Sequence, residues 1–145
     1  MLVTDGGGLP IGLVVESAQV AEIRLAERTV ETIRVTRPRG RPKTRPARLT
    51  CDRAYDSGPF RRYLRRRGIA SGIPARRRPS HYRPKRGRPI VADRAAYRSR
   101  WHVERTFAWL LSYRRIVVRW DRQVGVYRGF VLFALALICL NRLLQ

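Results

Sequence analysis

The first apolar positions of the chain form two short runs separated by a turn signal. MLVT and IGLVVE are rich in Leu, Ile and Val, and DGGGLP between them carries the glycines and the proline of a turn. The pattern predicts a β-hairpin at the start of the chain. In the next segment, SAQVAEIRLAERTVETI, apolar residues recur at helical spacing, which predicts an amphipathic helix with Ser17 as its N-cap; they are Val20, Ile23, Ala26, Val30 and Ile33.

The rest of the chain alternates strand and helix patterns. LTCDRAY predicts a short strand that ends at Asp52, and SGPFRRYLRRRG predicts a helix with Ser57 as its N-cap and Gly68 after its end. IASGIPA is another short strand candidate. A long helix is predicted over 93–113, IVVRWDR predicts a short extended or turn segment, and a closing helix is predicted over 123–144.

This order of elements is typical of an α/β fold with helices at its C-terminal side. The length of 145 residues fits one domain, 1–145. The predicted strands are few, so we expect a mixed sheet that is incomplete at its N-terminal side, as if the sheet began before Met1.

Charge adds a class of partner to this picture. The net charge is +22, and residues 37–145 hold 29 basic and five acidic side chains, whereas residues 1–36 have an excess of acids. Such asymmetry indicates a polyanion, usually nucleic acid, with an anionic membrane surface as the alternative. Two basic loops, over 37–48 and 76–92, are predicted to contact phosphate; the alternative for both is a solvated, disordered segment.

Neither the cysteines nor the apolar segments indicate a secreted or membrane protein. Cys51 and Cys139 are far apart, which fits a reducing compartment. We expect a cytoplasmic, nucleoid-associated location. The start of the chain lacks a basic n-region, so it is not typical of a signal peptide. The longest apolar run, FVLFALALICL, is shorter than the ~20 residues that span a bilayer. We expect a core helix there, or a helix exposed for interaction.

An isolated glutamate stands out in the predicted long helix. Glu104 falls on one stripe with otherwise mostly apolar residues at alternating spacings of four and three; they are Tyr97, Trp101, Ala108 and Leu111. A carboxylate directed toward a core is costly unless it is paired or binds a metal. The alternative is a surface ion pair with Arg100, one turn earlier.

A second carboxylate favours the metal interpretation. Asp52 lies at the predicted carboxyl end of a strand, where sites form in open α/β sheets. The alternative is that Asp52 has a structural role, in a turn or as a helix cap. Because hard cations such as Mg²⁺ prefer oxygen ligands, Asp52 and Glu104 together, in a basic chain, indicate a divalent metal site.

At these residues the chain resembles the DDE transposases of insertion sequences, of the group called IS-five or IS-four-like. The catalytic domain of that family is RNase H-like. YRSRWHVERTFAWLL places Tyr97, Arg100 and Glu104 in register with the family motif, and CDRAYDS resembles the segment with the family's second aspartate, here Asp52. The hairpin sequence MLVTDGGGLPIGLVV is similar too, so the resemblance covers nearly the whole chain.

The resemblance implies Mg²⁺- or Mn²⁺-dependent cleavage and strand transfer of double-stranded DNA at transposon ends and a target. Asp52 and Glu104 would be catalytic metal ligands. Tyr97 and Arg100 would contact DNA, with packing as the alternative for Tyr97, and Arg114 and Arg115 would add DNA contacts. It also implies a homo-oligomer, with an upstream-frame polypeptide as a further candidate partner, and no membrane.

Departures from the family pattern limit this expectation. Leu111 stands at the family's lysine position, and we expect Arg115, on the same helical face as Glu104, to be the candidate replacement. The family's first aspartate belongs to a strand before the hairpin, and Asp5 is better interpreted as a turn residue. We therefore expect the isolated chain to be inactive. The alternatives are a DNA-binding remnant without catalysis and an unrelated basic RNA-binding protein.

Overall fold

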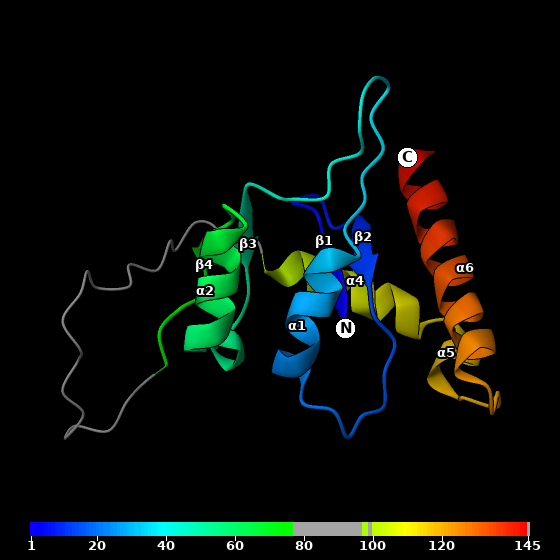
Figure 1. Ribbon diagram of the computed structural model, residues 1–145. Helices are drawn as coiled ribbons and strands as arrows, with labels where there is room; N and C mark the ends of the chain where they lie inside the picture. The colour runs from blue at the N-terminus through cyan, green and yellow to red at the C-terminus, as the bar shows by residue number, and fades with distance from the viewer. Residues whose placement is uncertain (77–96, 99, 145) are drawn as a thin grey trace, which may run out of the picture. The chain divides into compact units, whose positions relative to one another are not determined.

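A computed structural model describes residues 1–76, 97, 98 and 100–144 (Figure 1). These residues form two compact units. The terminal unit joins Met1–Thr44 to Trp101–Gln145, and the central unit is Arg45–Arg100. The single compact domain expected from the length is therefore divided, and only the central unit is contiguous in sequence.

The terminal unit begins with the predicted hairpin. Strand β1 (Leu2–Thr4) pairs antiparallel with β2 (Pro10–Leu13), and Leu2 lies opposite Leu13. The register shifts by a bulge after Val3. The prediction of strand, turn and strand is confirmed.

Helix α1 (Glu22–Glu31) packs on one face of this hairpin through a buried stripe of Leu25, Ala26, Thr29 and Val30. The helix predicted from Ser17 starts later, because Ser17 opens a turn instead. The Ser17 carbonyl accepts a hydrogen bond from the Val20 N–H at 3.2 Å, and Ala21 precedes the helix without a side-chain cap. The prediction of Ser17 as the N-cap is wrong.

Three further helices, α4 (Trp101–Leu111), α5 (Arg114–Val117) and α6 (Val124–Leu143), contact one another, and α4 also contacts β1 (Figure 1). Their shared core consists of Leu2, Leu110, Ile116, Val131, Ala134, Leu135 and Ile138. The predicted helix over 93–113 ends two residues early, since α4 stops at Leu111 and the extended Tyr113 precedes α5. Its predicted start at 93 lies outside the described residues. Helix α5 overlaps the predicted extended or turn segment IVVRWDR only at Ile116 and Val117.

Helix α6 agrees with the predicted closing helix over 123–144, but only part of its surface is core. An exposed stripe, called the α6 stripe, runs along it at alternating spacings of three and four; it consists of Val126, Gly129, Phe133, Ala136, Leu140 and Leu143. The helix is 20 residues long, so the length argument from the shorter apolar run does not apply. By length and composition alone it could cross a membrane, a test that core helices also meet, and only 22% of its apolar window is buried.

The central unit is a β–α–β arrangement. Strand β3 (Arg48–Thr50) pairs parallel with β4 (Ala70–Gly72), and a 3₁₀ turn η1 (Arg53–Tyr55) and helix α2 (Gly58–Arg66) connect them. The Ser57 hydroxyl accepts from the Phe60 N–H at 3.3 Å, and Gly68 adopts φ 65° after the helix, so both predicted ends of α2 are confirmed. The unit's core contains Phe60, Tyr63, Leu64, Ile69 and Ile73.

The described strands therefore form two separate two-stranded sheets within a mixed α/β protein, and not one sheet. Between α1 and β3, residues 34–44 form an exposed arm, closed at its base by two backbone hydrogen bonds between Val35 and Lys43, at 2.9 and 2.8 Å. The exposed loop predicted over 37–48 is confirmed as mostly exposed. The loop predicted over 76–92 lies outside the described residues, except for Arg76.

Candidate active site and nucleic-acid interface

Asp52 lies two residues after β3, at the carboxyl end of the parallel pair β3–β4. Its Oδ1 accepts a hydrogen bond from the Ala54 N–H at 2.8 Å, so Asp52 is the N-cap of η1. Within the described part of the chain this is its only side-chain hydrogen bond, which leaves Oδ2 available. Asp52 therefore combines the capping role weighed from the sequence with one carboxylate oxygen that a cation could bind.

Asp56, only four residues later, has a structural role. Its Oδ1 accepts from Arg61 Nε at 2.8 Å, and its Oδ2 accepts from the Arg76 N–H at 2.7 Å. Arg61 also donates to the Ile73 carbonyl at 2.7 Å and to the Ser71 hydroxyl at 3.2 Å. Both oxygens of Asp56 are therefore occupied in joining η1, α2 and the end of β4.

Cys51 has no features of a nucleophile. Burial, and then the negative charge of Asp52, raise the pKa of the Cys51 thiol to about 12, although Arg61 acts in the opposite direction. A thiol that stays protonated at neutral pH is inert. The chemistry of this corner of the unit therefore depends on Asp52.

Glu104 lies in the first turn of α4 and is exposed. The predicted core-facing stripe is wrong: Trp101 is 49% exposed, Leu111 is 55% exposed, and Ala108 is exposed too. The buried side of α4 is instead the one with Thr106 and Leu110. Trp101 and Phe107 are therefore not core residues, whereas Trp109 packs against the core. Arg100 lies in a turn before α4.

The turn between β1 and β2 holds α4 in place. The Thr106 hydroxyl lies 2.7 Å from the Gly8 carbonyl and 2.9 Å from the His102 carbonyl, both of them acceptors. The Gly7 carbonyl accepts from Arg105 Nη2 at 3.3 Å and from Arg142 Nη2 at 3.1 Å. The helix that carries Glu104 is thus fixed against the hairpin on a side of the helix where Glu104 does not lie.

Arg105 is itself clamped between two aromatic rings. Its guanidinium carbon lies 4.4 Å from the centre of the Trp101 ring and 4.8 Å from that of Trp109. Trp101 also stacks on His102, with ring centres 4.1 Å apart. Arg105 therefore links α4 to the turn at Gly7 from between these two rings.

Asp5 is a turn residue, as predicted. Its Oδ1 accepts hydrogen bonds from the N–H groups of Gly7 and Leu9, at 2.9 and 2.8 Å. Gly8 adopts φ 92°, a left-handed conformation that favours glycine. Asp5 is therefore occupied in shaping the turn that receives α4.

Asp52 and Glu104 belong to different units, Asp52 to the central unit and Glu104 to the terminal unit. Among the described residues there is no group of three His, Cys, Asp or Glu side chains that could hold a metal ion. A pocket of about 210 Å³ between α4 and α6 has no acidic lining; its residues are Trp109, Ser112, Tyr113, Ile138, Asn141 and Arg142. The candidate ligands for a cation thus remain Asp52 and Glu104.

The predicted DNA contacts differ in exposure. Arg100 lies over the Tyr97 ring, 5.6 Å from its centre, and both residues are half-buried. Arg114 is exposed. Arg115 does not share a helical face with Glu104, because it lies on α5, and that prediction is wrong. It pairs with Asp121 at 3.2 Å and lies 4.6 Å from the centre of the Phe130 ring.

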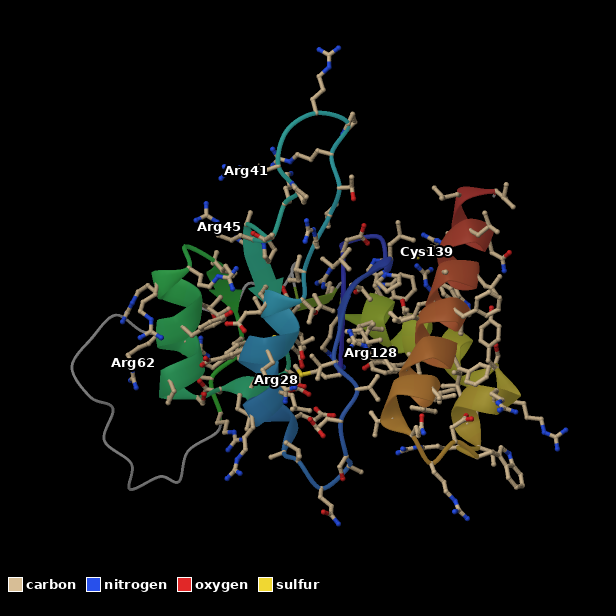
Figure 2. All side chains as sticks on the ribbon, turned by 45° about the vertical axis from the view of Figure 1, so that its right-hand side comes forward. Arg28, Arg41, Arg45, Arg62, Arg128 and Cys139 are labelled. Atoms are coloured by element: carbon tan, nitrogen blue, oxygen red, sulfur yellow. The ribbon has the colours of Figure 1, made fainter. Side chains whose placement is uncertain are left out.

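Sequence reasoning missed one basic face. Arg62, Arg65 and Arg66 of α2 are exposed, and Figure 2 shows Arg62 directed away from the helix. Their spacing of three and four residues is a helical-face signal that could have been found. Figure 2 shows Arg41 on the arm, beside its projecting end, and five exposed cations lie along the arm: Arg34, Arg37, Arg39, Arg41 and Lys43. These two surfaces are the best candidates for phosphate contacts.

Fold and surface together define a basic, mixed α/β protein with two acidic residues that could bind a cation. Residues 1–139 match the family described as Transposase DDE domain, and the chain belongs to that family. Over 143 residues it is 35% identical to a Burkholderia cepacia protein named as a transposase for insertion sequence element IS402. The aligned region covers 98% of this chain and 62% of that relative. No solved structure matches the chain.

Proposed function

We propose that the chain acts in DNA transposition, as part of a DDE transposase that cleaves and joins DNA strands at insertion-sequence ends. The observation that carries the proposal is Asp52, which caps η1 with one oxygen and keeps the other available at the carboxyl end of β3 and β4. The family match supports it, as does the exposed acid Glu104, which the sequence resemblance implies to be the family's glutamate. An RNase H-like arrangement of the sheet is part of the same proposal.

Asp52 and Glu104 are the residues that would hold a divalent cation, Mg²⁺ or Mn²⁺, since both offer hard oxygen donors. When bound, such an ion stabilises negative charge on the oxygens of a phosphodiester. Two carboxylates are a small ligand set, and the described residues contain no group of three His, Cys, Asp or Glu side chains that could hold a metal ion. We therefore propose that this chain by itself binds the ion weakly and does not cleave DNA.

The cations bind the DNA backbone in this proposal. Arg62, Arg65 and Arg66 form a convex helical face that can approach successive phosphates, and Arg114 is exposed for the same purpose. Tyr97 and Arg100 are proposed to contact DNA together with Glu104, as the family motif implies. Arg115 is exposed too, but it contributes less, because it pairs with Asp121 and lies against the Phe130 ring.

We also propose that a second copy of the chain covers the α6 stripe. Spacings of three and four repeat along the stripe, which is the pattern by which two helices form a shared seam. No charged side chain interrupts the stripe, so two copies meet there without repulsion. Phe133→Glu should convert a dimer to a monomer in light scattering. Association only with a longer transposase polypeptide, or with neutral lipid vesicles, would contradict the dimer.

A metal titration by calorimetry tests the catalytic proposal. The Asp52→Asn variant keeps a capping side chain, and Glu104→Gln changes an exposed site, so both should fold normally. Each should weaken Mn²⁺ binding by about tenfold or more, whereas Glu31→Gln, another exposed helix glutamate, should not. Equal affinities in all four proteins would overturn the assignment. DNA binding that is sensitive to salt but insensitive to metal would favour the second candidate, a DNA-binding protein without catalysis.

A further inference from the structure

The exposed arm has an unusual arrangement of residues at its tip. Arg39 and Arg41 stand on either side of Gly40, and Pro38 and Pro42 enclose the three residues. Both arginines are exposed. No acidic residue occurs between Glu31 and Asp52, so the arm has no internal counter-charge.

The tip is also narrow. Gly40 adopts φ 85°, and a Cβ atom added there would meet nothing within 4 Å. Within the arm, the cross-arm backbone hydrogen bonds end at the pair Val35 and Lys43, and Pro38 and Pro42 lack N–H groups of their own. The end of the arm therefore carries Gly40, which has no side chain, between two exposed arginines.

This shape and charge fit the minor groove of A·T-rich DNA. That groove is ~6 Å wide, and A-tracts narrow it further and strengthen its negative potential, which attracts arginine. Its floor offers the acceptors A N3 and T O2, which suit the donor-only guanidinium groups. At G·C pairs the N2 amino group fills the floor and is itself a donor. The tip carries no Asn, Gln or acidic side chain that would pair with the adenine or cytosine edge in the major groove.

We propose that the arm inserts Arg39, Gly40 and Arg41 into the minor groove of A·T-rich double-stranded DNA. This inference rests on the proposed DNA-binding function and adds to it a groove and a base preference. The arm would orient the duplex on the protein, while the arginines of α2 bind phosphate without regard to sequence.

Binding of the full chain to three duplexes tests the proposal by fluorescence anisotropy. Their central tracts are A·T, G·C and inosine·cytosine; the last resembles A·T in the minor groove and G·C in the major groove. We expect A·T and inosine·cytosine tracts to bind about tenfold more tightly than G·C. A double variant, Arg39→Lys with Arg41→Lys, keeps the charge but should reduce binding of the A·T and inosine·cytosine duplexes to the level of the G·C duplex. The matched control at the base of the arm, Arg34→Lys with Arg37→Lys, should keep the preference.

Three outcomes would overturn the inference. They are equal affinities for all three duplexes, an affinity for the inosine·cytosine duplex as low as for the G·C duplex, or an affinity for double-stranded RNA equal to that for the A·T duplex. If these occur while the Asp52 and Glu104 variants still lose Mn²⁺, only the arm proposal fails. If the protein binds no duplex at all, the proposed function fails with it.

Discussion

The Thr106 hydroxyl donates a hydrogen bond across 98 positions of sequence to the Gly8 carbonyl, at 2.7 Å. Thr106 is fully buried, and this contact ties α4 to the turn of the N-terminal hairpin. It is a link between the first and last thirds of the chain that no local pattern contains.

Replacement of Thr106 tests that link. Thr106→Val keeps the shape but removes the donor, so the Gly8 carbonyl loses its partner. We expect the free energy of unfolding to fall by about 1–3 kcal/mol in urea titrations. Thr106→Ser restores the hydroxyl and should recover part of the loss. Equal stability of the Val variant and the parent would show that water replaces the contact.

Asp56 and Asp52 should respond differently to the same change. Asp56 is 6% exposed and Arg61 is 20% exposed, so Asp56→Asn leaves a partly buried guanidinium without its counter-charge. We expect a loss of about 2 kcal/mol or more in the stability of the central unit, followed by urea titration. Asp52→Asn keeps a good N-cap and should change stability by less than about 0.5 kcal/mol. The reverse order would assign the structural role to Asp52.

The Cys51 thiol makes the stability of the protein depend on pH at alkaline values. Its pKa is raised from 9.0 to about 12 in the folded chain, so the folded state holds the proton more tightly than the unfolded state. The stabilisation that this difference in pKa contributes to the folded state is complete below about pH 9, and it is lost as the pH rises toward 12. Cys51→Ala should flatten that part of the curve of unfolding free energy against pH.

Thiol labelling gives an independent readout of the same burial. At about pH 8 an aromatic disulfide reagent should modify Cys139 first, because Cys139 is less buried, and Cys51 only when urea unfolds the central unit. Rapid modification of Cys51 in the native protein would contradict the burial. Cys139→Ala is the matched control, since it should leave only the slow phase.

Replacement by alanine should change the stability of the protein in opposite directions at two glycines. A Cβ at Gly12 would lie 2.9 Å from Thr32 Oγ1 and 3.2 Å from the Thr29 carbonyl oxygen, so Gly12→Ala must push α1 away from β2. We expect a loss of about 1–3 kcal/mol. Gly129 lies inside α6 with nothing within 4 Å, so Gly129→Ala should gain about 0.5–1 kcal/mol. Thermal unfolding of both variants checks the pair, at low protein concentration so that the α6 stripe stays unpaired.

Elements with strong local signals were predictable from the sequence. The hairpin has its glycines and proline, and α2 has Ser57 before it and Gly68 after it, so their positions follow from short-range chemistry. Asp5 was assigned correctly as a turn residue for the same reason. The start of α1 was not, because Ser17 can begin either a helix or a turn, and its neighbours favoured the turn.

The orientation of α4 could not be predicted from its own residues. Large apolar side chains occur on every side of that helix, so periodicity does not single out one face. Which face of α4 is buried depends on Thr106 and Arg105, whose hydrogen-bond partners lie in the turn at Gly7 and Gly8. The strand before Asp52 was predicted from the strand pattern alone, although it ends at Thr50 and not at Asp52. Glu104, in contrast, was expected on the wrong face.

The double hydrogen bond to the Gly7 carbonyl has a consequence for biosynthesis. Arg142 is 135 positions from Gly7, so the hairpin cannot acquire all its partners until the last turn of α6 has left the ribosome. The central unit is continuous in sequence and has its core residues in place well before that moment. Folding should therefore proceed from the middle of the chain outward, with the N-terminal hairpin waiting longest for its native contacts.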